Sequence, residues 1–139
     1  MTETPTPTPR EMEILKVLWD LGPSSVRVVY DHLRQVEEKL AYNTIQTMLR
    51  IMEEKGLVKH RTEGRTFVYS PSFSRDESAV RFLERVFDGA ADQLVMSLLR
   101  TERISAAELE SMHEMIAAAR QKNARGKSGR SGRYAGGKP

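Results

Sequence analysis

Polar side chains that can recognise nucleic acid repeat at helical spacing in the first half of the chain. The repeat consists of Asn43, Gln46, Thr47 and Arg50. Their amide, hydroxyl and guanidinium groups form hydrogen bonds that match base edges and phosphate oxygens. No aspartate or glutamate occurs from Leu40 to Met52, so no carboxylate would repel a polyanion there. The pattern predicts one helix face that could contact nucleic acid.

Three cations follow in a segment that is typical of a β-hairpin. Lys59, Arg61 and Arg65 lie around the dipeptide Glu63-Gly64, which is a two-residue hairpin signal. Cations on a short projection suit phosphate contact, with an affinity that depends on salt.

The predicted strands of this hairpin run from residue 58 to 62 and from residue 65 to 69. A loop at residues 63–64 pairs Val58 with Tyr69, and His60 with Phe67, on an inward face. The two cations of the first strand, at positions 59 and 61, then point the other way.

Three predicted helices precede the hairpin and position both groups. The first starts with a capping box of Thr8 and Glu11. In the third, an apolar stripe of Ile45, Met48, Leu49 and Met52 lies opposite the polar one. The helices span about residues 9–21, 25–35 and 41–55. Three helices and a hairpin are the order of a winged helix-turn-helix, so we expect a mainly α fold with a small β-hairpin.

The second half of the chain carries apolar stripes on short amphipathic helices. One of these helices starts with a capping box of Ser105 and Glu108. Such helices cannot bury their stripes alone, and a second copy of the chain is the simplest partner. The predicted dimerisation residues are Leu83, Val86, Phe87, Leu94, Leu98, Leu109, Met112 and Ile116.

Composition and charge divide the chain into four predicted parts. They are a disordered leader at residues 1–8, a winged-helix domain at 9–72, a helical dimerisation domain at 73–121 and a disordered basic tail at 122–139. The net charge is +3, but the tail holds six basic residues and no acid, so the rest of the chain is net acidic. A basic face must therefore come from the placement of charges.

Several other classes of protein are disfavoured. The chain has no cysteine and three histidines without paired spacing, so we expect no metal site and no cofactor. No nucleophile with a base and no glycine-rich phosphate loop occurs, so we expect no enzyme. No apolar run approaches the ~18 residues of a membrane span. The opening MTETPTPTPR lacks the features of a secretion signal, so we expect a cytoplasmic protein.

An ordered set of stretches resembles the penicillinase and methicillin-resistance repressors. The set covers about residues 7–71, with a weaker similarity from Phe82 to Ile116. The stretches are Pro7–Ile14, Val17–Trp19, Thr44–Arg50, Lys55–Leu57, Glu63–Arg65 and Phe67–Tyr69.

This resemblance implies a homodimer with an N-terminal winged-helix domain and a C-terminal helical dimerisation domain. Such repressors bind inverted-repeat operators and block transcription, commonly of β-lactamase and its membrane-bound sensor protease. Position by position, the resemblance places four residues on the recognition helix, namely Thr44, Gln46, Thr47 and Arg50. It places Arg65 on the wing. Asn43 begins the helix where members of the family vary.

The chain departs from its relatives in two places. In several of them, induction proceeds by proteolysis of an Asn-Phe bond in the dimerisation domain, and the corresponding residues here are Ser97 and Leu98. These two residues are the candidate proteolytic site, although neither matches the usual pair. The copper-responsive branch carries a C-terminal cysteine motif, which this chain lacks, so sensing through metal thiolates is excluded.

Two other hypotheses compete with that of an operator-specific dimeric repressor. Each feature alone is common on proteins that never touch DNA, and only their joint order favours DNA binding. In the second hypothesis, the chain is a protein-interaction winged helix without specific DNA binding, and its third helix docks a partner protein. In the third, the chain is a repressor that binds an inducer near the domain junction.

Overall fold

The computed structural model describes residues 5–129, with side chains described as far as residue 126. Internal contacts divide the chain into two compact units, Met1–Val86 and Phe87–Pro139. The predicted limit between the domains, after residue 72, lies inside the first unit and stays a prediction. In the predicted leader, residues 5–8 form neither helix nor strand, and residues 1–4 lie outside the described part.

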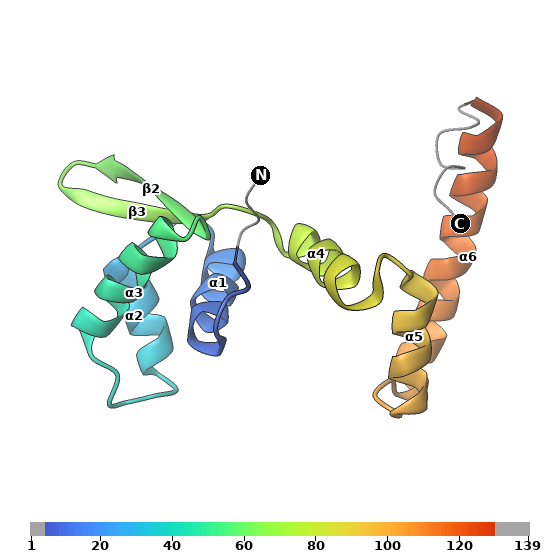
Figure 1. Cartoon of the computed structure of the whole chain (residues 1–139), viewed down its shortest axis with the longest axis horizontal. Helices are drawn as coiled ribbons and strands as arrows, with labels where there is room; N and C mark the ends of the chain where they lie inside the picture. The colour runs from blue at the N-terminus through green and yellow to red at the C-terminus, as the bar shows by residue number, and fades with distance from the viewer. Residues whose placement is uncertain (1–4, 130–139) are drawn as a thin grey trace. The chain divides into compact units, whose positions relative to one another are not determined.

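The first unit has the predicted order of three helices followed by a hairpin. Its elements are α1 (Pro9–Leu21), β1 (Ser24–Ser25), α2 (Val26–Arg34), α3 (Tyr42–Glu54), β2 (Val58–Glu63), β3 (Thr66–Pro71) and α4 (Arg75–Phe87), the last of which reaches the unit boundary. The sheet is antiparallel with the order β1-β3-β2, and α1, α2 and α3 gather beside the β2–β3 hairpin (Figure 1). The mainly helical fold with a small sheet is confirmed. The two-residue β1 was not predicted, because two serines carry no strand pattern.

Side-chain caps determine where several helices begin. Thr8 and Glu11 form the predicted capping box, with the Thr8 Oγ1 accepting from the Glu11 N–H at 3.2 Å and the Glu11 Oε1 accepting from the Thr8 N–H at 2.9 Å. Ser25 caps α2. Ser74 and Glu77 form a further capping box before α4, which was not predicted from the sequence. These local bonds fix the helix starts that tertiary packing then uses.

The hairpin register differs from the predicted one by two residues. His60 pairs with Tyr69 and not with Phe67. Val58 pairs with Pro71 and not with Tyr69. Because side chains alternate along a strand, a shift by two residues keeps each residue on its predicted face. The cations of β2 therefore still point away from the face that holds His60.

The hairpin loop explains this shift. The two loop residues are Gly64 and Arg65, and Glu63 is the last paired residue of β2. Gly64 has a φ of 66°, and a glycine with positive φ at the first of two loop positions fits a type II′ turn. The predicted loop, Glu63-Gly64, would place the positive φ at its second position instead.

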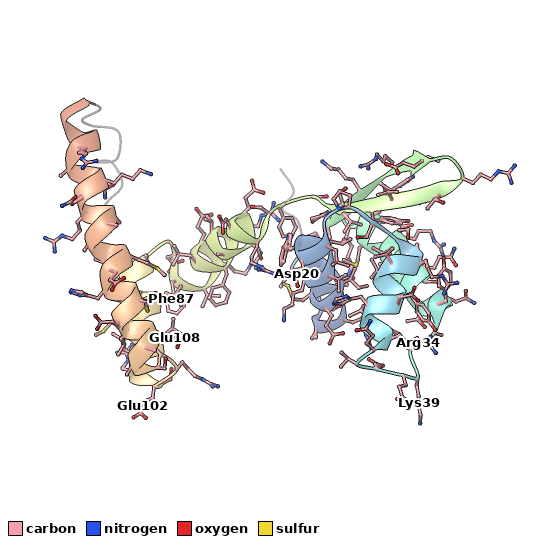
Figure 2. All side chains as sticks on the ribbon, turned by 180° about the vertical axis from the view of Figure 1, so that it is seen from behind. Asp20, Arg34, Lys39, Phe87, Glu102 and Glu108 are labelled. Carbon is pink, nitrogen blue, oxygen red and sulfur yellow. The ribbon has the colours of Figure 1, made fainter. Side chains whose placement is uncertain are left out.

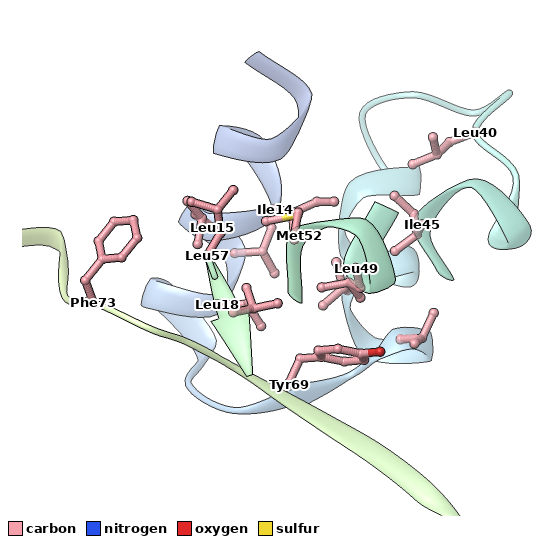
Figure 3. Close-up of a cluster of buried hydrophobic side chains, with 14 residues drawn as sticks. Ile14, Leu15, Leu18, Leu40, Ile45, Leu49, Met52, Leu57, Tyr69 and Phe73 are labelled. Carbon is pink, nitrogen blue, oxygen red and sulfur yellow. The ribbon is translucent and has the colours of Figure 1, made fainter. Parts of the chain in front are cut away.

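Apolar side chains from all three N-terminal helices and the sheet form the core of the first unit (Figure 3). From α3, Ile45, Leu49 and Met52 are each 0% exposed. They meet the buried Leu15 and Leu18 of α1 in the same cluster. Burying such a side chain stabilises the fold by roughly 1.5–3 kcal/mol, so these contacts fix the rotation of α3 about its own axis.

An ion pair between a buried carboxylate and a half-buried lysine ties the start of α1 to the end of α3. Glu11 is 3% exposed, and its Oε2 accepts a hydrogen bond from the Nζ of Lys55 at 2.7 Å. Burial raises the pKa of Glu11, but the hydrogen bonds from Lys55 and Thr8 outweigh it and lower the pKa below its ordinary value. The carboxylate is therefore ionised and depends on its partners.

The second unit contains α5 (Ala91–Arg100) and α6 (Ala106–Gly129). Ser105 and Glu108 form the predicted capping box of α6, with bonds of 2.9 and 3.1 Å. The prediction of disorder from residue 122 was wrong for residues 122–129, which are helical. Lysine, alanine and arginine, which are good helix formers, occur there at positions 122, 124, 125 and 127. Residues 130–139 lie outside the described residues.

We expect Lys55→Met to lower the free energy of unfolding by about 1–3 kcal/mol, because it leaves the buried carboxylate of Glu11 without its charged donor. Chemical denaturation followed by circular dichroism measures this loss. Lys16→Met is the matched control, since Lys16 is an exposed lysine of α1, and it should change stability by less than about 0.5 kcal/mol.

The difference between wild type and Lys55→Met should also depend on pH. Because the folded-state pKa of Glu11 is lowered, its contribution is complete above the pKa of an unfolded glutamate, about 4.3. That contribution is lost as the pH falls through the lowered folded-state pKa. The gap in stability should therefore close in acid, and a constant gap down to low pH would contradict the assigned role.

Candidate nucleic-acid interface

Two chemically different faces run along α3. The core residues Ile45, Leu49 and Met52 occupy one face. All the predicted contact residues of this helix are exposed on the rest of its surface, namely Asn43, Thr44, Gln46, Thr47 and Arg50. A helix turns by about 100° per residue, which gathers four of them on one arc and leaves Thr44 at its edge. The helix therefore presents a continuous polar stripe to solvent.

The hairpin presents the predicted cations, and all three are exposed. Lys59 and Arg61 lie on β2, and Arg65 lies in the loop. The Nε of Arg61 donates to a carboxylate oxygen of Glu63 at 2.7 Å, so an acid on the same strand balances its charge. Among the described residues, Lys59 and Arg65 form no ion pair. Of the three hairpin cations, these two therefore have charges that are available to an anion in the free protein.

A tight turn joins α3 directly to the hairpin. Gly56 has a φ of 86°, and its N–H donates to the carbonyl of Glu53 at 3.0 Å. The next N–H, of Leu57, donates to the carbonyl of Met52 at 2.9 Å. These two bonds form a Schellman motif, and Leu57 is fully buried. The polar stripe and the hairpin are therefore joined without a free loop between them.

Side chains also link the last turn of α3 to both long strands. The Nδ1 of His60 on β2 lies 2.8 Å from each carboxylate oxygen of Glu53 on α3. The His60 ring stacks on Phe67 of β3, with centroids 4.0 Å apart and an interplanar angle of 15°. The ring of Tyr69 lies 5.6 Å from that of His60. The hairpin is thereby tied to the helix that carries the polar stripe.

Aromatic rings and arginines surround the start of α3. Tyr42, the first residue of α3, meets Tyr30 of α2 edge-on at 5.5 Å, and the Arg27 guanidinium lies 4.7 Å from the Tyr42 centroid. Arg34 and Lys39 lie toward the α2–α3 connection, away from the hairpin (Figure 2). No local sequence pattern marks Arg27, because its place beside α3 depends on how α2 and α3 pack.

The described residues offer little for other kinds of site. Between residues 5 and 129, no cluster of three or more histidine, aspartate or glutamate side chains could hold a metal ion. No helix in that part of the chain combines the length and apolar character that crossing a membrane requires. The polar stripe and the hairpin cations are thus the main chemical feature of this surface.

Sequence comparisons find relatives over most of the chain. A family model described as penicillinase repressor matches residues 7–118, from α1 into α6. The penicillinase repressor of Bacillus licheniformis is 28% identical over 120 residues, which are 84% of this chain and 93% of that protein. The methicillin resistance regulatory protein MecI of Staphylococcus aureus (strain N315) is 20% identical over 110 residues, which are 76% of this chain and 89% of that protein.

Solved structures give similar matches. The DNA-binding domain of the repressor BlaI is 32% identical, with a TM-score of 0.48, over 55% of this chain and 93% of that one. The Bacillus licheniformis BlaI monomeric form in complex with the blaP half-operator is also 32% identical, with a TM-score of 0.47 and the same coverage.

Glu63→Gln should tighten binding to duplex DNA of any sequence, because it removes the carboxylate that balances Arg61. One additional phosphate contact should steepen the slope of log affinity against log salt by up to about 0.9. Fluorescence anisotropy on a shuffled duplex at several salt concentrations measures that slope. Glu84→Gln makes the same change of charge on α4 and should leave the slope unchanged. If wild type and Glu63→Gln gave the same slope, Glu63 would not restrict the contact of Arg61 with phosphate.

Proposed function

The chain belongs to the penicillinase repressor family of DNA-binding transcriptional repressors, and we propose that it binds an inverted-repeat operator as a homodimer. The observation that carries this proposal is the division of α3 into a buried apolar face and an exposed polar one. The major groove of B-DNA is about 12 Å wide and admits one α-helix. A helix whose inner face is packed and whose outer face is free can enter it as a rigid probe.

The side chains of the exposed stripe suit base recognition. A guanidinium such as that of Arg50 can donate two hydrogen bonds to guanine O6 and N7, and the amide of Gln46 can pair with the N6 and N7 atoms of adenine. The hydroxyl and methyl groups of Thr47 add contacts to either a base edge or a thymine methyl. Asn43 and Thr44 flank these residues on the proposed contact surface.

The hairpin serves as the wing in this proposal. Lys59 and Arg65 contact phosphates on the backbone beside the groove, and Arg61 joins them to the extent that it exchanges Glu63 for a phosphate. Such contacts fix orientation without reading sequence. Because such contacts release counterions, the affinity falls as salt rises.

A second copy of the chain would cover the apolar stripes of the C-terminal half. No side chain from Ser74 to Gly126 is buried in the single chain, and Val86, Leu109 and Ile116 are 53%, 44% and 54% exposed. We assign to the dimer interface Leu83, Val86, Phe87, Leu94, Leu98, Leu109, Met112 and Ile116. A two-fold dimer places two recognition helices in successive major grooves, about 34 Å apart.

The family resemblance extends this proposal to the regulated genes and to the inducing signal. The regulated genes would encode β-lactamase or belong to a related operon, and the repressor would act in the cytoplasm. The inducing partner would be a membrane-bound sensor protease. The candidate cleavage residues, Ser97 and Leu98, lie inside α5 and are half-buried. Exposed loops are the usual places of proteolytic cleavage, so cutting this bond would require α5 to unwind.

The competing hypothesis of a protein-interaction module is not favoured. The protein is a regulator and not an enzyme, and members of its family are named as repressors. A small-molecule inducer at the domain junction stays a prediction.

Thr47→Ala and Arg50→Ala should each reduce sequence preference by about 1–3 kcal/mol, because each removes a contact to a base. The measurement compares affinities for two duplexes, one that the wild type selects from a random-sequence pool and one with its sequence shuffled. Lys59→Ala and Arg65→Ala should instead weaken both duplexes alike and lower the salt slope by about 1 each. If the variants at Thr47 and Arg50 keep both wild-type affinities, the contact face is wrongly assigned.

Ile116→Arg should convert the dimer into a monomer, because it introduces a charge into an apolar interface. Ile116 is 54% exposed in the single chain, so the substitution itself should not unfold the monomer. Sedimentation velocity measures the oligomeric state, and Ser111→Arg, on the opposite side of α6, is the matched control. Affinity for a full inverted repeat should fall while that for a half-site persists. An unchanged dimer would remove α6 from the interface.

A further inference from the structure

Glu53 is the acid that lies closest in sequence after the proposed reading residues. Arg50 precedes it by three positions, and residues three or four apart on a helix are neighbours, with about 5–6 Å between their Cβ atoms. Glu54 is the other carboxylate within this reach. An arginine that pairs with such a carboxylate is held in a fixed geometry and has fewer donors left for a base. The reading residue therefore has two potential competitors for its guanidinium on its own helix.

His60 engages Glu53 from the hairpin. Both carboxylate oxygens lie 2.8 Å from the Nδ1 of His60. An ionised carboxylate can only accept hydrogen bonds, so the Nδ1 proton donates to it. Stacking on Phe67 at 4.0 Å holds the ring in place. The carboxylate of Glu53 is thus directed toward the hairpin.

Arg50 and Glu53 nevertheless share one region of space. Burial raises the pKa of the Tyr69 phenol, the charge of Glu53 raises it further, and the charge of Arg50 lowers it. Both charges therefore lie near the Tyr69 side chain. Even so, within residues 5–129 Arg50 forms no ion pair with a carboxylate.

We infer that His60 is a positioning residue that keeps Glu53 away from Arg50 and so leaves the guanidinium available to DNA. The inference rests on the proposed function, since it gives His60 a role in sequence-specific binding without a contact to DNA. In the absence of His60, Glu53 pairs with Arg50 and also brings a negative charge toward the phosphates. Both effects lower the affinity for the preferred sequence.

A double-mutant cycle tests this role against that of a purely structural link. The probes are the duplex that the wild type selects from a random pool and its shuffled counterpart. His60→Ala should weaken binding to the selected duplex by roughly three- to fivefold, which is the size of a partly exposed ion pair. Glu53→Gln alone should not weaken it, and adding Glu53→Gln to His60→Ala should restore the wild-type affinity. The matched control, Glu54→Gln in the His60→Ala background, should not restore it.

The opposite pattern would overturn the inference. If the His60–Glu53 bond only braces the hairpin, then His60→Ala already breaks it, and adding Glu53→Gln to His60→Ala should restore none of the lost affinity. If His60→Ala proves unstable in thermal unfolding, His60→Phe replaces it in the cycle, because it keeps a ring against Phe67 but has no hydrogen-bond donor. A wild type that does not prefer the selected duplex would refute the proposed function instead, so the two failures are distinguishable.

Discussion

Apolar packing against one side of α3 constrains everything that this protein presents to DNA. Ile45 and Leu49 are completely buried, and a rotation of the helix by one residue would exchange Ile45 with the neighbouring Gln46. That exchange would expose an apolar side chain, at about 1.5–3 kcal/mol, and bury an amide without a partner, at about 1–3 kcal/mol. The core thus sets which side chains point outward. The same core holds Leu57, from which the hairpin starts.

Charge pairing shapes the surface around this helix. The chain is not basic before its last residues, so a field attractive to DNA depends on how its acids are held. Close to the proposed interface, four acids are paired with bases, whereas Glu54 forms no ion pair among the described residues. The pairs are Glu11 with Lys55, Glu53 with His60, Glu63 with Arg61 and Asp31 with Arg27. In the pair of Glu11 and Lys55 the carboxylate is buried, and that pair stabilises the fold. The more exposed pairs contribute little stability and mainly decide which cations stay available.

The two halves of the chain solve the problem of burial in different ways. The first unit has a continuous apolar core, which supports a rigid recognition surface. From Ser74 to Gly126, by contrast, no residue is buried within the single chain, so those helices depend on another surface for their stability. In the proposed dimer, the contacts that stabilise these helices also set the separation of the two recognition helices. Folding of the second half and recognition of a symmetric operator would then share one interface.

The sequence alone determined the order of the helices and the hairpin, the caps of α1 and α6, and which residues from 43 to 50 face solvent. All of these follow from periodicity and from bonds that span three or four residues. Tertiary structure decided the hairpin register, because local turn signals allowed two loop positions and only the backbone selected one. It also decided that Arg27 lies on Tyr42 and that His60 holds Glu53. These pairs come from different elements, and their distances depend on how helix and sheet pack, which no local pattern encodes.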